Sequence, residues 1–365
     1  MSDNNNLLIE SSPQIKQFDS TQSVMWSVSL CLLPAGVWGA WIFGPRVIGV
    51  LAASIIAALV SEAAMMYLVK KNTLKDGSAF LTGLLIGFNM PPAIPYYIPV
   101  VASVFAIVVV KWTYGGLGGN FMNPALAGRV FVFFSWTGPM TKWTMPHSLA
   151  AVDAVTKATP LGYVKSGLLD YTGSANGPAQ FLVQNGYPHT VADTGVTSWL
   201  NAHLGLHLSN GYVDMFLGNI PGSLGEVSVL LLLIGSIYLF IRKIITWEIP
   251  VSYLVTFSLF IWVFGGTRFA DGSYFSGDIL FHLFTGGIIL GAFYMATDMV
   301  TSPQTRKGML IFGSGAGFLT FLIRIYGSFP EGVSLAIILM NIFVPMINKY
   351  TKSKRFGVEE KKESK

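Results

Sequence analysis

VIGVLAASIIAALVSEAAMMYLV, residues 47–69, is an apolar run that indicates what kind of fold this chain adopts. It holds 23 residues and a single charged group, Glu62, and a helix needs about 20 apolar residues to cross the hydrocarbon core of a bilayer. Lys70, Lys71 and Lys75 follow at once. A long apolar run that ends in a basic cluster is typical of a transmembrane helix reaching a membrane surface.

The composition of the whole chain also indicates a membrane protein. Of its 365 residues 52% are hydrophobic and 11% are charged, whereas soluble domains have about 25% charged residues. The net charge of +5 indicates basic loops rather than nucleic-acid binding, because no basic stripe is interleaved with aromatic residues. The single cysteine, Cys31, excludes an intrachain disulfide and an iron–sulfur cluster held by this chain alone.

The order of apolar runs predicts an all-α polytopic membrane protein with about ten transmembrane helices in two repeat-like halves. The predicted spans are 24–43, 47–69, 78–90, 96–114, 121–136, 227–241, 249–264, 279–296, 309–325 and 333–347. The third is short enough to be a re-entrant segment instead. The halves echo each other weakly, with Asp76-Gly77-Ser78 before one run and Glu331-Gly332-Val333-Ser334 before another, an echo that chance similarity explains equally well.

The spans divide the chain into five regions. These are an N-terminal tail (1–20), a first membrane half (21–137), a polar insertion (138–225), a second membrane half (226–348) and a basic tail (349–365). With ten spans, most lysines and arginines of the loops fall on one side, together with both termini. The positive-inside rule then predicts cytoplasmic termini and an insertion outside the cytoplasm.

Polar groups in or beside the apolar runs are candidates for ion coupling, because charges in a membrane are costly. The candidates are Glu62, Asp76, Asn123, Arg129, Asp298 and Arg324. Each also has a structural reading as a helix cap or as part of an ion pair. Asn123-Pro124 would interrupt a helix and free carbonyls for an ion or ligand, or simply pack as a helix break.

No constellation for catalysis or for a metal site is evident, so we expect neither catalytic residues nor a metal ligand set. His203 and His207 are one helical turn apart but lack the spacing of a zinc motif. The glycine-rich residues 115–119 follow no strand, which excludes a dinucleotide fingerprint.

The stretch Asp153-Ala154-Val155-Thr156-Lys157-Ala158-Thr159-Pro160-Leu161 lies in the polar insertion. Taken alone it is a loop with hydroxyl groups in a small-residue setting, closed by a proline. It resembles the signature Asp-x-x-(Ser/Thr)-Gly-Ala-Thr of a family that contains the D subunit of the Rnf ferredoxin:NAD oxidoreductase complex and the B subunit of the sodium-pumping NADH:quinone reductase. Lys157 stands where the family has glycine.

Further motifs carry the same resemblance over most of the chain, from about residue 75 to 345. They are Lys75-Asp76-Gly77-Ser78, GGLGGNFMNPALAGR at 115–129, Gly222-Ser223-Leu224-Gly225-Glu226, Ala296-Thr297-Asp298 with Thr301-Ser302-Pro303, and Glu331-Gly332-Val333 with Leu339-Met340-Asn341. Their order makes the resemblance specific, and the chain looks closer to the Rnf protein than to the quinone-reductase protein.

The resemblance implies a flavoprotein subunit that carries FMN on Thr159 through a phosphoester bond. Thr156 and Asp153 would orient the phosphate or be read by the attaching transferase, with Ala158 and Pro160 completing the motif. The related quinone-reductase protein also holds riboflavin noncovalently, which makes a second flavin a further expectation here.

By the same resemblance the subunit would relay electrons between ferredoxin and NAD and couple them to Na⁺ or H⁺ translocation. It would lie in a prokaryotic cell (inner) membrane, in contact with lipid, with Thr159 outside. It would be active only with the other Rnf subunits, which hold iron–sulfur centres and flavin. The alternative is a channel or secondary transporter for a small solute, with a urea-channel-like fold and no redox role.

Overall fold

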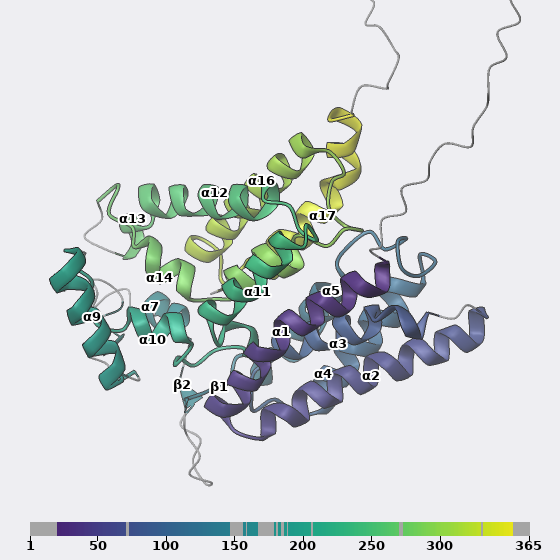
Figure 1. The fold of residues 1–365 in the computed structure, drawn as a ribbon, viewed down its shortest axis with the longest axis horizontal. Helices are drawn as coiled ribbons and strands as arrows, with labels where there is room; N and C mark the ends of the chain where they lie inside the picture. Colours follow the sequence, from purple (N-terminus) through teal and green to yellow (C-terminus); the bar gives the residue numbers. More distant parts are fainter. Residues whose placement is uncertain are drawn as a thin grey trace, which may run out of the picture.

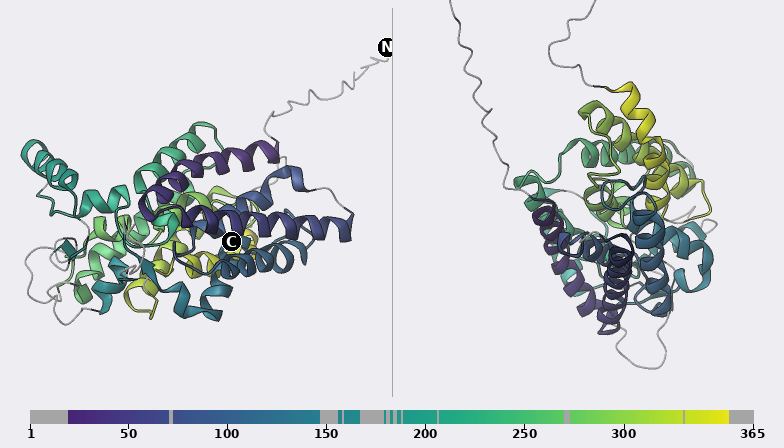
Figure 2. Two further views of the ribbon diagram at one scale, coloured as in Figure 1. Left: turned by 90° about the horizontal axis from the view of Figure 1, so that it is seen from below. Right: turned by 90° about the vertical axis from the view of Figure 1, so that its right-hand side faces the viewer.

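The computed structural model is almost wholly helical (Figure 1). It describes residues 20–70, 73–146, 156–157, 159–166, 179, 182–183, 186–187, 189–205, 207–269, 273–329 and 331–352. Figure 2, in its right-hand view, shows the first half of the chain (purple to blue) and the second half (green to yellow) as neighbouring helical bundles.

The first half is a run of helices joined by short turns. Its elements are α1 Thr21–Phe43, α2 Arg46–Val69, the 3₁₀ turn η1 Leu74–Asp76, α3 Ser78–Phe88, α4 Tyr97–Val104, the π-helical η2 Phe105–Trp112 and α5 Pro124–Ser135. Helix α3 is buried over nearly its whole length. A helix this short is therefore enclosed by protein rather than by lipid, which is the setting that membranes require of interrupted segments.

The insertion holds short elements. They are α6 Thr137–Met140, β1 Trp143–Thr144, β2 Thr156–Lys157, α7 Pro160–Ser166, α9 Val191–Leu204, α10 Tyr212–Leu217 and the 3₁₀ turn η3 Leu224–Glu226. In Figure 1, α7, α9 and α10 lie at the left, whereas α1 begins and α17 ends toward the upper right. The insertion and the two described ends of the chain are therefore on different sides of the molecule.

The second half is also a run of helices, and one of its predicted spans is broken. Its elements are α11 Val229–Ile241, α12 Glu248–Phe264, α13 Gly266–Phe269, α14 Ile279–Phe284, α15 Ile288–Leu290, the π-helical η4 Gly291–Met295, α16 Arg306–Ile325 and α17 Val333–Tyr350. The predicted eighth span is thus not one helix. Gly286 and Gly287 adopt φ of +76° and +63°, and this left-handed pair interrupts it.

Five helices of the described residues are long and apolar enough to cross a membrane. They are Thr21–Phe43, Arg46–Val69, Glu248–Arg268, Arg306–Ile325 and Val333–Tyr350. Shorter apolar helices are Ser78–Phe88, Tyr97–Trp112, Pro124–Ser135 and Val229–Ile241. Each of the ten predicted runs contains helix in the described residues, which agrees with a multi-pass membrane protein.

The two halves meet through helices in equivalent positions. The first predicted span, α1, packs on the sixth, α11, and the fifth, α5, packs on the tenth, α17. Within each half the second helix packs on the fourth, α2 on α4 and α12 on α16. These contacts correspond between the two halves of the sequence. The echo around Asp76 and Glu331 is local instead: it falls on the third and tenth runs, which both begin after a left-handed glycine, Gly77 (φ +78°) and Gly332 (φ +77°).

Close approach between α2 and α3 depends on Gly83. A Cβ atom there would lie 2.7 Å from Ile55 Cα and 2.9 Å from the Ser54 carbonyl oxygen. Both are backbone atoms, so the two helices would have to separate. Gly138 offers a matched control, because nothing lies within 4 Å of a Cβ atom placed on it.

We predict that Gly83→Ala lowers the thermal unfolding midpoint of the detergent-purified subunit, because overpacking costs about 1–3 kcal/mol. Gly138→Ala should leave the midpoint unchanged. Differential scanning fluorimetry of both variants makes the comparison. Equal midpoints for Gly83→Ala and wild type would contradict the described contact between α2 and α3.

Candidate functional site

Thr159, the predicted attachment residue, lies directly before helix α7. Its hydroxyl oxygen accepts a hydrogen bond from the backbone N–H of Gly162 at 3.1 Å, and the residue is 3% exposed. A threonine that bonds the third helical residue in this way is an N-cap. Pro160 takes the first helical position, where its missing N–H costs nothing. Thr159 and Pro160 therefore have a structural role of their own.

The chain before Thr159 forms a short antiparallel ladder. Trp143 of β1 pairs with Lys157 of β2, and Thr144 pairs with Thr156. Asp153 and Ala158, two further residues of the predicted signature, lie outside the described residues. The described residues do not test the roles predicted for Thr156 and Asp153. They do place the backbone of Thr159 between the β-ladder and helix α7.

Lys165 fixes α7 to the second membrane half. Its ammonium group donates to the carbonyl oxygens of Arg324 and Phe329, at 3.2 Å each, and to that of Gly327. These carbonyls lie at or beyond the C-terminal end of α16, where a cation is favoured by the helix dipole. Burial, with smaller contributions from the charges of Arg268 and Arg324, lowers the pKa of Lys165 from 10.5 to about 8.

Arg324, a predicted ion-coupling residue, is buried at the end of α16. Its guanidinium group donates to the carbonyl oxygens of His282 at 2.6 Å and Gly286 at 3.1 Å, which flank the break in the eighth run. It also donates to the Glu331 carbonyl oxygen at 3.3 Å. These bonds hold the broken helix to α16 and give Arg324 a structural function.

Helix α7 and Arg324 meet at Gly286. A Cβ atom on Gly286 would lie 2.5 Å from Leu161 Cδ1 and 2.6 Å from Arg324 Nη2. The first turn of α7, the helix break and the guanidinium group therefore pack with no room for a side chain. The residue that caps α7, Thr159, is held over the second membrane half by this contact.

Glu62, the charge inside the second span, is completely buried and ion-paired. Its Oε1 lies 2.9 Å from the ammonium nitrogen of Lys111, which is also buried. The same carboxylate accepts hydrogen bonds from Trp112 Nε1 at 2.9 Å and Thr73 Oγ1 at 2.6 Å. Sequence reasoning missed Lys111, although a lysine inside a predicted span gives the same signal that singled out Glu62.

Asp76 joins this network through Ser78. Lys111 donates to Ser78 Oγ at 2.7 Å, and Ser78 Oγ donates to Asp76 Oδ1 at 2.6 Å. Asp76 also accepts from the Ser78 backbone N–H at 2.8 Å. The chain Asp76–Ser78–Lys111–Glu62 thus connects α2, α3 and η2 by hydrogen bonds between buried or half-buried groups.

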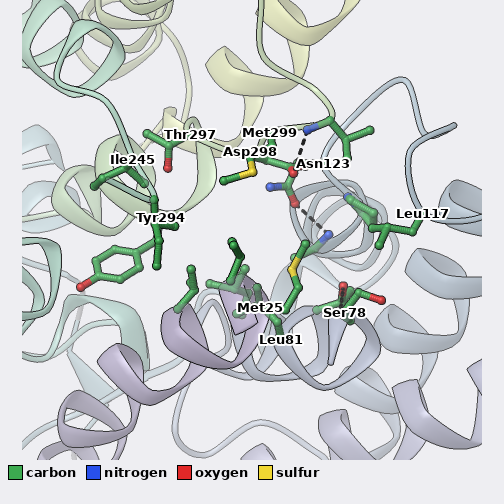
Figure 3. A pocket seen from close by; sticks show the side chains of 18 of the residues that line it. Met25, Ser78, Leu81, Leu117, Asn123, Ile245, Tyr294, Thr297, Asp298 and Met299 are labelled. Carbon is green, nitrogen blue, oxygen red and sulfur yellow. Dashed lines mark hydrogen bonds between the residues drawn. The ribbon is translucent and has the colours of Figure 1, made fainter. Parts of the chain in front are cut away.

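A cavity opens beside this network (Figure 3). We call it the inner cavity; its polar or charged lining residues are Ser78, Thr82, Lys111, Asn120, Asn123, Tyr294, Thr297 and Asp298. Most of the remaining lining is apolar. Such a cavity, with a few convergent polar groups, is typical of a small-molecule site.

Two predicted residues, Asn123 and Asp298, line the inner cavity. Asn123 caps α5 through its side-chain oxygen, and its amide nitrogen donates to the Met295 carbonyl at 3.2 Å, at the end of η4. Asp298 accepts from Thr301 Oγ1 at 3.1 Å and from the Val300 N–H at 3.3 Å. The break at Asn123-Pro124 is therefore capped by Asn123. The same side chain links α5 to η4 in the second half of the chain.

Arg129 lies one turn further along α5 than the residues that line the inner cavity. It forms an ion pair with Glu331, and its other terminal nitrogen donates to Ser334 Oγ. Glu331 Oε1 is buried and has no hydrogen-bond partner in the described part of the chain. Glu331 belonged to a recognised motif, but its position in the chain gave no sign of this pairing across 202 residues.

A second, smaller cavity opens beside this pair. We call it the outer cavity; it is lined by Arg129, Val130, Phe133, Thr141, Trp143, Phe329, Glu331, Gly332, Ser334 and Leu335. The predicted polar residues thus fall into two groups. One lies around the inner cavity, and the other lies around the outer cavity and α7. In the described residues no cluster of three His, Cys, Asp or Glu side chains is placed to hold a metal ion.

Comparison with known proteins shows similarity over nearly the full length of the chain. The model of the NQR2, RnfD, RnfE family matches residues 8–357. Three relatives are D subunits of ion-translocating complexes. The chain is 43% identical to that of the proton-translocating ferredoxin:NAD(+) oxidoreductase complex of Clostridium ljungdahlii, with 96% of each chain covered. It is 40% identical to that of the Na(+)-translocating ferredoxin:NAD(+) oxidoreductase complex of Acetobacterium woodii, covering 99% of this chain and 98% of that one. It is 36% identical to that of the ion-translocating oxidoreductase complex of Stutzerimonas stutzeri, covering 93% and 92%.

Replacement of Lys111 by methionine should lower the thermal unfolding midpoint strongly, because removing one partner of a buried ion pair costs about 3–5 kcal/mol. The double variant Lys111→Met/Glu62→Gln removes both charges and should recover much of that loss. Lys142→Met, at an exposed lysine, is the control. A double variant no more stable than Lys111→Met would show that the buried charge of Glu62 is not what destabilises the single variant.

The lowered pKa of Lys165 predicts an amine that reacts at unusually low pH. Since the folded-state pKa of about 8 lies below 10.5, folding stability rises as the pH increases from about 8 to 10.5, because the cost of burying the charged amine is relieved. The rate of acetylation of Lys165, followed by peptide mass spectrometry on the native protein, should have its midpoint near pH 8. A midpoint near 10.5 would contradict the described burial of the ammonium group.

Proposed function

Since the chain belongs to the NQR2, RnfD, RnfE family, we propose that it is the membrane flavoprotein subunit of an Rnf-type complex. It relays electrons between ferredoxin and NAD through FMN bound covalently to Thr159, and the complex couples this flow to ion translocation. It acts only together with the other subunits of the complex. The observation that carries the proposal is the match over 96% of the chain to a relative named for ferredoxin:NAD(+) oxidoreduction.

The residues around Thr159 suit a tethered flavin. FMN, when bound, supplies one- and two-electron redox chemistry, and the protein supplies its position and surroundings. A phosphoester needs only a hydroxyl group, which Thr159 has at the junction of the β-ladder and α7. Because this hydroxyl is buried, attachment must precede the final packing of the loop or be accompanied by its opening.

The inner cavity is the place in the described structure that best suits a second, noncovalent flavin such as riboflavin. Its walls are mostly apolar, with hydroxyl, amide and carboxylate groups from several elements (Figure 3). A flavin needs both kinds of surface, apolar for its ring and polar for its ribityl hydroxyls.

Orientation and coupling ion belong to the same proposal. The loops carrying Lys70, Lys75, Arg242 and Lys243 are taken as cytoplasmic, which puts both termini inside and Thr159 outside in a ten-span arrangement. Two relatives of similar identity are named for different ions, protons and Na⁺. Overall similarity therefore does not select the ion for this chain, and Glu62, Asp76 and Asp298 are the carboxylates to test.

A channel or secondary transporter is the second candidate. The arrangement in two halves and a cavity between interrupted helices favour it, because many transporters bind their substrates in such places. Covalent flavin separates the two functions, since a passive solute pathway has no use for it.

We predict that the denatured wild-type subunit, co-expressed with the flavin transferase, gives a fluorescent gel band under ultraviolet light. Thr159→Asn should abolish the band, because asparagine keeps the N-cap but has no hydroxyl to esterify. Thr159→Ser should keep it. Thr194→Val is the control, because it removes a threonine of α9 that is not a helix cap. The band should keep its wild-type intensity in this variant.

Two results would contradict the flavin carrier. One is a band of wild-type intensity in Thr159→Asn, which would place the flavin elsewhere. The other is a dark wild-type band despite co-expression, which would favour the channel or transporter.

A further inference from the structure

Helix α9 of the insertion turns polar side chains toward the protein. Asp193 and Thr197, one helical turn apart, are 0% and 2% exposed. The Asp193 carboxylate accepts hydrogen bonds from the backbone N–H groups of Gly211 at 2.7 Å and Val213 at 3.0 Å. These N–H groups lie at the start of α10, where a carboxylate satisfies donors that the helix itself leaves free. The side of α9 that bears Asp193 is therefore fixed against α10.

Bonds at both ends of α9 fix the same side. At its start, Thr190 donates its backbone N–H and its hydroxyl to the Asp214 carboxylate, at 2.8 Å each. Near its end, the side-chain amide of Asn201 accepts from the backbone N–H of Leu208 at 2.7 Å and donates to the Leu208 carbonyl at 2.9 Å. The helix is thus bound along its length, and its rotation about its own axis is set.

The opposite face of α9 is apolar and exposed. Ala192, Val196 and Trp199 follow one another at helical spacing, and all three are exposed, Trp199 by 55%. The Trp199 indole stacks on His203, with ring centroids 4.9 Å apart. Asp193, which is buried, is the only Asp, Glu, Lys or Arg in the sequence of α9. A helix on an aqueous surface turns its apolar face inward and its charges outward, so the polarity of α9 is reversed.

The direction of α9 suits the surface of a membrane. In Figure 1 it runs across the direction of α2 and α12, two of the helices long enough to span a bilayer. The left-hand view of Figure 2 shows it (teal, upper left) at the edge of the molecule. A helix that lies in the plane of a bilayer surface has this direction relative to the spans, and it buries an apolar face between the lipid headgroups.

The depth of α9 along the spans also fits. The Leu217 carbonyl, at the end of α10, accepts a hydrogen bond from Trp38 Nε1 at 2.8 Å. Trp38 lies five residues before Phe43, the last residue of α1, an axial distance of ~7.5 Å. Helix α10 therefore reaches the level of the outer ends of the spans. Since α9 packs on α10, it lies within one helix layer of that level, and the headgroup region is about 5–7 Å deep.

We infer that α9 lies on the bilayer surface at the insertion's end of the molecule, with Ala192, Val196 and Trp199 in contact with lipid. Lipid fits this face better than a protein partner, because the face continues the apolar surface of the spans. Near the same end, α1 exposes Trp41 by 70%, and tryptophan is enriched where membrane and water meet. The contact anchors the insertion beside the membrane helices. It goes beyond the proposed function and does not depend on a flavin.

The test compares two faces of α9 in the full-length subunit, reconstituted in phosphatidylcholine nanodiscs. Ala192→Cys and Val196→Cys place a thiol on the apolar face, and Ser198→Cys, also exposed, is the matched control on another side of the helix. Each is made in Cys31→Ala, because Cys31 is the only other cysteine, and is labelled with the fluorophore NBD. Unfolding midpoints should stay at the value of Cys31→Ala, since the replaced residues of α9 are exposed.

The readout is quenching of NBD from each side of the interface. Lipids with a nitroxide on carbon 5 of the acyl chain should quench the probe at positions 192 and 196 several-fold more than at 198. Aqueous iodide should quench the probe at 198 several-fold more than at 192 and 196.

Two results would overturn the inference. One is lipid quenching at 192 and 196 that is no stronger than at 198. The other is strong iodide quenching at 192 and 196 in the isolated subunit that disappears only in the assembled complex, which would assign the face to a partner subunit. Neither result bears on the attachment at Thr159, because the measurement needs no flavin, and a dark gel band would leave the membrane contact of α9 unaffected.

Discussion

The docking of α7 on the end of α16 joins the segment that holds Thr159 to the membrane helices. The ammonium group of Lys165 and the guanidinium group of Arg324 together bind carbonyls at the end of α16, at the break around Gly286 and before α17. Carbonyls at helix ends must find donors when water is scarce. Two side chains supply them here, and the same bonds hold the loop of Thr159 against the second membrane half.

Helix α5 places the two cavities close together. Pro124 and Ala125 line the inner cavity, and Arg129 and Val130 line the outer one. From Ala125 to Val130 the helix rises by ~8 Å. Residues that line the two cavities therefore lie within two turns of each other on α5.

Hydropathy predicted most of the fold, since lipid-facing helices need long apolar runs, and each predicted run contains helix. The break in the eighth run was missed, although its Gly286-Gly287 pair is a signal for one. Thr159 was singled out by motif as the attachment residue, which stays a prediction; its capping role could have been read from the threonine followed by proline. The pairs Glu62–Lys111 and Arg129–Glu331 could not be predicted, because they join residues 49 and 202 positions apart and depend on tertiary packing.

The mass of one peptide tests the central claim most directly. Cleavage after Lys157 and Lys165 releases residues 158–165, which contain Thr159. In the protein isolated from its native membrane, this peptide should carry the added mass of FMN less one water, with fragment ions placing it on Thr159. The bare peptide mass as the only species would contradict the flavin-carrier function.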